Sequence, residues 1–201
     1  MSAENPVFAR ILSQFDHLYK KVQELYGPKS DLDGYQFSRV ILENNGPHIR
    51  FFDRDPNEVA IALNYRVLND EPQGLCQLAH EIVHLLYVRR DKKANMLEEG
   101  AAVNFSIYGP IYQSGDYRDK IFSYLVTEPC AKNYADALDL YRKLPSIDDK
   151  AIIKIRAIHP DMSDVKPGDI QRILPGVDDG LAAQLCEKRQ MRQISAASDR
   201  T

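Results

Sequence analysis

The chain has 201 residues and a formal net charge of −3, with 44% hydrophobic and 27% charged residues. This length suits one medium-sized domain, or one domain with a small appendage, and the composition is typical of a soluble globular protein. The small negative charge argues against a general attraction to nucleic acid or to anionic membranes.

Residues 5–26 are predicted to form a helix. Asn5 can cap its start, and apolar residues recur along it at helical spacing. Gly27-Pro28 ends the pattern.

Residues 35–68 are predicted to form three short strands, which we expect to be antiparallel. The segments YQFSRVIL, HIRFF and EVAIALNY are rich in β-branched and aromatic residues, and the turn sequences ENNGP and DRDPN separate them. In the last segment, larger apolar residues alternate with Ala60, Ala62 and Asn64.

The rest of the chain is predicted to be mainly helical. The first three helical segments span residues 72–89, 95–108 and 117–144, the last with an interruption near Pro129. After Pro145 the pattern indicates a short helix, a turn and another helix. We therefore expect an α+β fold with a core of residues 1–145 and a small helical C-terminal part of residues 146–201.

The sequence His80-Glu81-Ile82-Val83-His84 lies in the first of these helices. Residues four apart share a helix face, so both imidazoles can reach one metal ion. Glu81 points away from the midpoint of the pair, where a carboxylate can take a proton from a water that the metal activates. The alternative is an exposed helix with two surface histidines. A separate core face favours the first interpretation; it comprises Leu75, Leu78, Ala79, Ile82, Val83 and Leu86.

A third ligand is available at the start of the next helix. A tetrahedral catalytic zinc takes three protein ligands and keeps one open position. Glu98 and Glu99 begin a helix that can pack across the first, and Gly100 with Ala101-Ala102 would allow a close approach of the two helices. Acidic residues also favour a helix N-terminus through the helix dipole, so the pattern alone leaves both roles open.

The segments HEIVHLLYV and MLEEGAAVNFS together resemble the gluzincin group of zinc metallopeptidases. In this group His-Glu-x-x-His is followed by a glutamate on a second helix. The resemblance covers residues 76–108. It implies a zincin-like fold, in which a short antiparallel sheet packs on the active-site helix and further helices follow, and it implies a zinc-dependent peptidase acting on a peptide or protein.

Matched residue by residue, the resemblance implies that His80, His84 and Glu99 are the zinc ligands. Glu81 is the implied general base. Glu98 occupies a variable position of the family pattern and is the second choice as a ligand.

The resemblance is incomplete. Thermolysin-like members carry an aspartate four residues after the glutamate ligand, where it orients a histidine; here that position is Val103, with Asn104 one place off. The group that orients the histidine must therefore come from elsewhere, or the histidine is oriented more weakly. No Gly-Ala-Met-Glu-Asn motif is present, which leaves endo- and exopeptidase activity open. An edge strand pairs with substrate in this group, and VAIALNY is the candidate.

Peptide hydrolysis also requires a donor to the developing oxyanion. His159 and Tyr108 are our main candidates, His159 because zincins often draw a second histidine from downstream of the metal helices. The further candidates are Tyr112, Tyr124, Tyr134 and Arg156.

The segment ILPGVDDGLAAQLCEKR is similar to half of a helix-hairpin-helix, a module that binds the DNA backbone. Gly176 fits this pattern, but Asp178 and Asp179 would repel phosphate at the turn. We favour a capped helix pair. The alternative function is a non-catalytic zincin-fold protein, or one that binds a partner or DNA through these helices.

Three features favour a cytoplasmic location without a membrane partner. The first residues lack the pattern of a signal peptide, and no apolar run is long enough to span a bilayer. Cys76, Cys130 and Cys186 are odd in number and widely spaced, unlike a disulfide framework. We interpret Cys76 as a buried thiol rather than a ligand.

Overall fold

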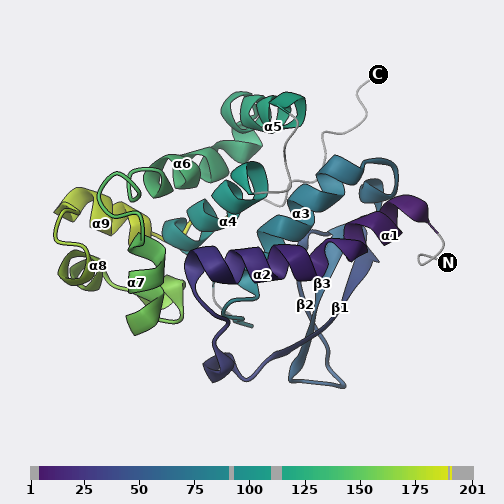
Figure 1. The fold of residues 1–201 in the computed structure, drawn as a ribbon, viewed down its shortest axis with the longest axis horizontal. Coiled ribbons are helices and arrows are strands. Elements are labelled where there is room, and N and C mark those ends of the chain that lie inside the picture. Colours follow the sequence, from purple (N-terminus) through teal and green to yellow (C-terminus); the bar gives the residue numbers. More distant parts are fainter. Residues whose placement is uncertain (1–4, 91–92, 110–114, 190, 192–201) are drawn as a thin grey trace.

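The structure combines a small sheet with helices that cover it and extend beyond it, an α+β fold as predicted. The computed structural model describes residues 5–90, 93–109, 115–189 and 191 (Figure 1). The helices described are α1 (Pro6–Ser13), α2 (Phe15–Tyr26), α3 (Glu71–His84), α4 (Met96–Tyr108), α5 (Gly115–Thr127), α6 (Lys132–Tyr141), α7 (Ala151–Ile158), α8 (Pro167–Ile173) and α9 (Asp179–Cys186). The strands are β1 (Gln36–Glu43), β2 (His48–Phe51) and β3 (Glu58–Asn64). Within this part of the chain, no helix is both long and apolar enough to cross a membrane.

The N-terminal helix is divided in two. The side chain of Asn5 caps α1, as predicted, by accepting hydrogen bonds from the backbone N–H groups of Val7 and Phe8. The helical pattern then breaks at Gln14, which separates α1 from α2. Both helices bury apolar residues in the main core, so the predicted stripe of apolar residues is confirmed except at its last member, Leu25, which is half exposed.

The sheet is mixed, with the strand order β1-β3-β2. β2 pairs antiparallel with β3, whereas β1 pairs with β3 in parallel, so the prediction of a purely antiparallel sheet is wrong. The chain reverses between β1 and β2, but β3 inserts between these two strands and therefore runs in the same direction as β1. β3 is thus the central strand, and the prediction that VAIALNY is an edge strand open to substrate is wrong.

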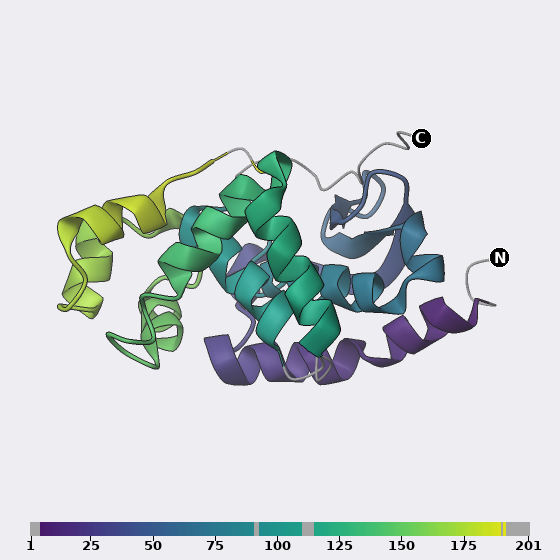
Figure 2. The same cartoon turned by 90° about the horizontal axis from the view of Figure 1, so that it is seen from above.

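Helix α3 lies between the sheet and α4. It contacts β3 and α4, and α4 in turn contacts α6, which lies across it in Figure 2. The predicted core face is confirmed, because Leu78, Ala79, Ile82 and Val83 are all buried. The helix ends at His84 instead of near Arg89, which places the second histidine of the motif in its last turn.

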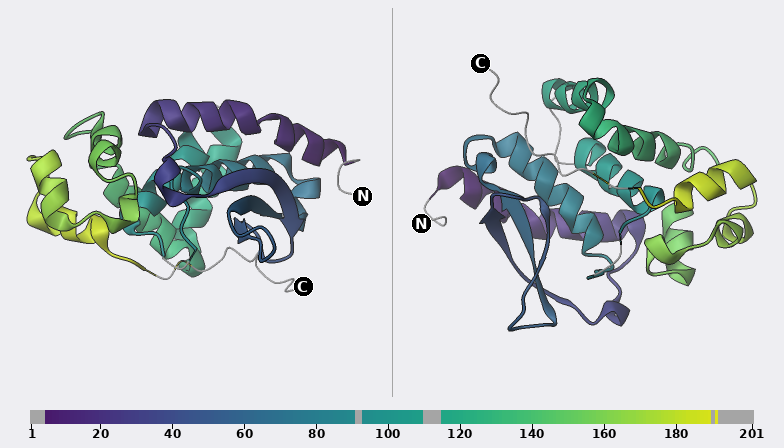
Figure 3. Two further views of the ribbon diagram at one scale, coloured as in Figure 1. Left: turned by 90° about the horizontal axis from the view of Figure 1, so that it is seen from below. Right: turned by 180° about the vertical axis from the view of Figure 1, so that it is seen from behind.

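Helices α7 to α9 lie at the other end of the molecule from the sheet (Figure 3). They nevertheless contribute residues to the same hydrophobic core as α1 to α4. Hydrogen bonds also join them to the rest of the chain. The backbone N–H of Met96, at the start of α4, donates to the carbonyl of Glu187 over 2.9 Å. The Arg156 guanidinium donates to the carbonyls of Tyr26, Gly27, Pro28 and Leu86.

The turn between α8 and α9 is a capped helix pair, as we favoured from the sequence. The side chain of Asp178 accepts a 2.7 Å hydrogen bond from the backbone N–H of Leu181 and so caps α9. Asp179 accepts a hydrogen bond from Gln171 of α8. Two carboxylates therefore occupy the turn where a helix-hairpin-helix would bind phosphate.

Gly100 allows a close approach, but to α6 and not to α3 as the sequence suggested. A Cβ at this position would collide with the carbonyl oxygen of Ala137 and would lie 2.7 Å from the Cβ of Tyr141. Both atoms belong to α6, which packs against α4. A side chain at Gly100 would therefore force these two helices apart.

We expect Gly100→Ala to destabilise the fold by about 1–3 kcal/mol, because overpacking outweighs the better helix propensity of alanine. The free energy of unfolding in urea measures this effect. Gly168→Ala in α8 is the matched control, since a Cβ there meets nothing within 4 Å. That change should leave stability unaltered or raise it by up to about 1 kcal/mol. Equal stability of the two variants would contradict the close packing of α4 on α6.

Candidate metal centre

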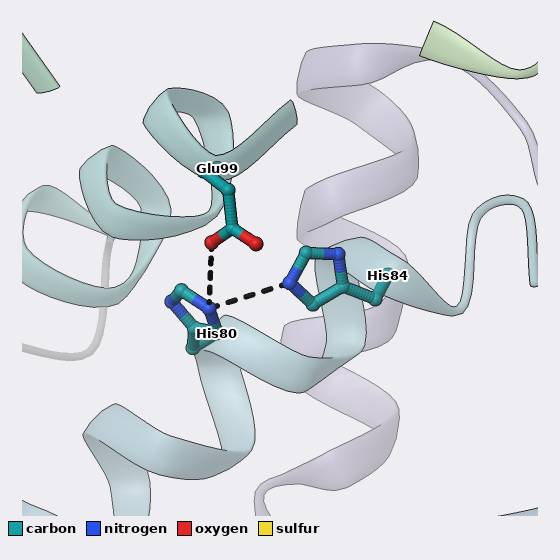
Figure 4. Close-up of side chains that lie close together, drawn as sticks. All are labelled: His80, His84 and Glu99. Carbon is teal, nitrogen blue, oxygen red and sulfur yellow. Dashed lines mark hydrogen bonds and ion pairs between the residues drawn. The ribbon is translucent and has the colours of Figure 1, made fainter. Parts of the chain in front are cut away.

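The structure brings together His80, His84 and Glu99, the three ligands that the resemblance implies. The two histidines project from the last turns of α3, and Glu99 projects toward them from the first turn of α4 (Figure 4). The Nε2 atom of His80 lies 3.3 Å from Nε2 of His84 and 3.5 Å from Oε2 of Glu99. One donor atom from each residue lies within 4.8 Å of the other two. This His-His-Glu group can therefore hold a metal ion.

The surroundings of the Glu99 carboxylate support metal binding. Its Oε2 atom is buried and has no hydrogen-bond partner among the described residues. A buried carboxylate oxygen without a donor is costly, and a cation among the three side chains would compensate it. Two imidazole nitrogens and one carboxylate oxygen also form a donor set typical of zinc. The residues present thus fit a zinc ion.

Glu98 lies beside this group and binds the far side of a histidine. Its Oε1 atom lies 2.7 Å from Nδ1 of His84, while its Oε2 atom accepts hydrogen bonds from Arg89 and from Ser163. Because the bond with Glu98 favours a proton on Nδ1, it leaves the lone pair of Nε2 free to face the metal site. Glu98 is therefore placed to orient His84. In thermolysin-like proteins an aspartate at the position of Val103 orients a histidine, and valine cannot accept a hydrogen bond. Of the two acids, Glu99 is the one that belongs to the candidate metal-binding group.

The charges around His84 favour a cation at this position. Burial alone lowers the pKa of His84, but the hydrogen bond with Glu98 and the charges of Glu99, Glu98 and Glu81 outweigh it and raise the pKa to about 9. For Glu98, burial is likewise outweighed, by Arg89 and by the bond with His84, and its pKa falls to about 2. Glu98 is therefore an anion, and the carboxylates around His84 favour a positive charge there, which either a proton or a metal ion on Nε2 can supply.

Comparison of the chain with protein-family models, with curated proteins and with solved structures gave no match. The assignment of the site therefore rests on its geometry. That geometry establishes a three-residue group on two packed helices, next to a buried acid and a pocket.

The buried acid is Glu81, the implied general base. It follows His80 on α3 and is only 5% exposed. Burial raises the pKa of its carboxyl group, His84 and His80 oppose this rise, and Glu99 adds to it. Glu81 is absent from the candidate metal group but lines a pocket together with His80. The acid therefore faces the same space as one of the candidate ligands.

The pocket has a volume of about 380 Å³ and lies between α3, α4, α5 and α6. Most of its lining surface is apolar. The polar and charged residues that line it are Asp70, Gln73, Cys76, Gln77, His80, Glu81, Ser106 and Lys120. The apolar and aromatic residues that line it are Pro47, Val103, Ile107, Ile121, Leu125, Tyr117, Tyr124 and Tyr134. Such a concave, mostly apolar space with a few polar groups is typical of a ligand-binding site.

Tyr134 contacts one of the candidate metal ligands. Its ring centroid is 5.9 Å from that of His80, and its side chain lines the pocket. Burial raises the pKa of its hydroxyl group, and the charges of Glu99 and Glu81 raise it further. Tyr134 was one of several candidate oxyanion donors. Nothing in its local sequence sets it apart from the other tyrosines. Only the packing of α6 on α4 brings it to the site.

The main candidates for the oxyanion donor, His159 and Tyr108, have other partners in the structure. The structure places His159 at the end of α7, with Nε2 3.6 Å from the carboxylate of Asp169 in α8. Tyr108 ends α4 and lies under the guanidinium groups of Arg118 and Arg142. Its position is nine residues from Glu99, which corresponds to about 13 Å along the helix.

Of the further candidates, Arg156 serves the fold through its bonds to four carbonyl groups. Tyr124 lines the pocket, and Tyr112 lies outside the described residues. Cys76 also lines the pocket; burial raises the pKa of its thiol, while hydrogen bonds with Ser106 and Tyr117 oppose the rise. Cys76 is partly buried and does not belong to the candidate metal-binding group, which agrees with its interpretation as a thiol that is not a ligand.

Proposed function

We propose that this protein is a zinc-dependent peptidase. The observation that carries the proposal is the buried Glu99 oxygen without a hydrogen-bond partner, which faces His80 beside His84, with Glu81 next to the group. His80, His84 and Glu99 would hold the metal ion. A zinc ion in such a site would act as a Lewis acid and lower the pKa of water, so that hydroxide is available as a nucleophile near neutral pH.

Glu81 is the group that moves the proton. As a carboxylate it takes a proton from the attacking water, and as a carboxylic acid it delivers that proton to the nitrogen of the leaving amine. Its burial supports this role, because a raised pKa brings the carboxyl group closer to the pH at which it must both accept and release a proton. The amide of a glutamine could do neither.

Tyr134 is suited to stabilise the oxyanion that develops on the peptide carbonyl. A phenol with a raised pKa keeps its proton at physiological pH and so remains a hydrogen-bond donor. Its ring lies against His80 on the wall of the pocket, beside the position where the carbonyl would react. This role replaces those that the sequence suggested for His159 and Tyr108.

The pocket indicates the class of substrate. A peptide whose scissile bond lies beside Glu81 would place a neighbouring side chain between Val103, Ile107 and Leu125. Apolar walls favour an apolar side chain, since burial contributes roughly 25 cal/mol per Å² of apolar surface. The volume of about 380 Å³ has room for a large aliphatic or aromatic group. We therefore propose cleavage next to bulky apolar residues.

Zinc reconstitution followed by incubation with a mixture of defined peptides tests this function. We expect one zinc per chain and cleavage next to bulky apolar residues, which stops on chelation and resumes when zinc is restored. Mass spectrometry of the products and metal analysis of the dialysed protein provide the measurements. A chain that holds zinc but cleaves no peptide would be a non-catalytic metal-binding protein, and one that holds no zinc would refute the proposal altogether.

A further inference from the structure

The carboxylate of Glu98 joins the metal centre to the C-terminal part of the chain. One oxygen contacts Nδ1 of His84 over 2.7 Å. The other accepts a 2.7 Å hydrogen bond from the hydroxyl group of Ser163 and a further bond from Arg89. Glu98 is 2% exposed and Ser163 is 3% exposed. A candidate metal ligand is thus two hydrogen bonds away from a residue that follows α7.

Ser163 is itself fixed by the segment that contains it. Its backbone N–H donates to Oδ1 of Asp161 over 2.9 Å, and its hydroxyl oxygen accepts a 2.7 Å bond from the backbone N–H of Asn95. Asn95 caps α4 and donates in turn to the carbonyl of Met162. The segment around Met162 is therefore attached to the N-terminus of the helix that carries Glu98 and Glu99.

Arg89 completes the arrangement. Its guanidinium group binds Glu98 through Nη2 and Asp161 through Nη1, the latter over 2.5 Å. One planar group thus holds an acid from α4 and an acid from the C-terminal part in a fixed relation. Because these polar groups are buried, each lost bond would leave a partner without compensation from water.

We propose that Ser163, Asp161 and Arg89 are positioning residues that hold Glu98 against His84, so that the segment after α7 sets the affinity of the centre for its metal. The proposal rests on the metal-binding part of the proposed function. Residues that orient a metal-binding histidine typically contribute about 10–100-fold to metal affinity. Here the orienting carboxylate is held mainly by groups from outside the two metal-binding helices.

The alternative is that these contacts stabilise the fold without affecting the metal. Zinc affinity and thermal unfolding, measured on the same variants, separate the two. Zinc affinity is obtained by competition with a chromogenic chelator, and the absorption spectrum of the cobalt-substituted protein reports on the geometry of the ligands. The unfolding midpoint of the metal-free protein shows whether each variant is folded under the conditions used.

We expect Ser163→Ala to lower zinc affinity by about 10-fold and to shift the cobalt spectrum. Ser106→Ala is the matched control, because Ser106 is also 3% exposed and lies on α4, where its hydroxyl group donates to Val103. That variant should keep the affinity and the spectrum of the unaltered protein. Unaltered affinity in a folded Ser163→Ala protein would overturn the proposal.

A second variant covers the case in which Ser163→Ala does not fold. Arg89→Lys keeps the positive charge but cannot span Glu98 and Asp161 with a planar fork, so it should also lower zinc affinity. Native affinity in Arg89→Lys, with only a lower unfolding midpoint, would show a structural role and overturn the proposal. If the unaltered protein binds zinc but cleaves no peptide, the peptidase assignment fails while the affinity comparison still decides this proposal.

Discussion

Replacing Glu81 with glutamine is expected to lower the rate of peptide hydrolysis by about 10²–10⁴-fold, the usual contribution of a general acid-base group. Glutamine has nearly the same shape but cannot accept the proton of the attacking water. Zinc affinity should be unchanged, because Glu81 does not belong to the group formed by His80, His84 and Glu99. Stability should not fall, since burial disfavours the charged form of Glu81 and an amide is less costly to bury.

The kcat of the zinc-loaded variant and its zinc stoichiometry are the two measurements. Glu71→Gln is the matched control: it makes the same change at the start of the same helix, where Glu71 pairs with Arg10 at the surface. This variant should retain full activity. Full activity in Glu81→Gln would exclude Glu81 as the general base, whereas a loss of zinc would instead make it part of the metal site.

The sequence predicts the strands of this fold better than their arrangement. All three strands form in the segments rich in β-branched residues that turn sequences separate. Which strands pair, and in which direction, depends on contacts that no local pattern specifies. β3 illustrates the difficulty. Large residues alternate with Ala60 and Ala62 along this strand, and residues 59–63 are all completely buried. A strand without polar residues on either face is typical of the centre of a sheet.

The candidate metal centre could be predicted in part. Helical spacing places His80 and His84 on one face regardless of the rest of the chain, because four residues correspond to about one turn. The choice between Glu98 and Glu99 is different, since neighbouring residues on a helix point about 100° apart and either could face α3. The packing of α4 on α3 turns Glu99 toward Nε2 of His80 and Glu98 toward Nδ1 of His84, an arrangement that the sequence does not specify.

The contacts that orient the site could not be predicted from the sequence. Glu98 and Ser163 are 65 residues apart, and Arg89 and Asp161 are 72 residues apart. Nothing in the local sequence of Ser163 distinguishes it from a surface serine. The resemblance to gluzincins indicated only that an orienting acid was missing at Val103. The structure places Glu98 in contact with Nδ1 of His84, next to the candidate ligand Glu99, and Ser163 from the C-terminal part of the chain contacts Glu98 in turn.

Replacing Tyr134 with phenylalanine is expected to lower kcat by about 10²–10³-fold, as the loss of one oxyanion donor does in other hydrolases. The ring would remain against His80 and keep its contribution to the wall of the pocket. KM and zinc affinity should therefore change little, because the hydroxyl group acts on charge that develops only in the transition state. Steady-state kinetics of the zinc-loaded variant, with a peptide that carries a bulky apolar residue, separates kcat from KM.

Tyr108→Phe is the control that distinguishes Tyr134 from one of the two main candidates that the sequence suggested. It removes the same hydroxyl group at the far end of α4, where Tyr108 stacks under two arginines. Its kcat should equal that of the unaltered protein. Loss of activity in Tyr108→Phe but not in Tyr134→Phe would reverse the assignment. A rise in KM without a fall in kcat for Tyr134→Phe would mean that Tyr134 binds the ground state, so that the oxyanion needs a different donor.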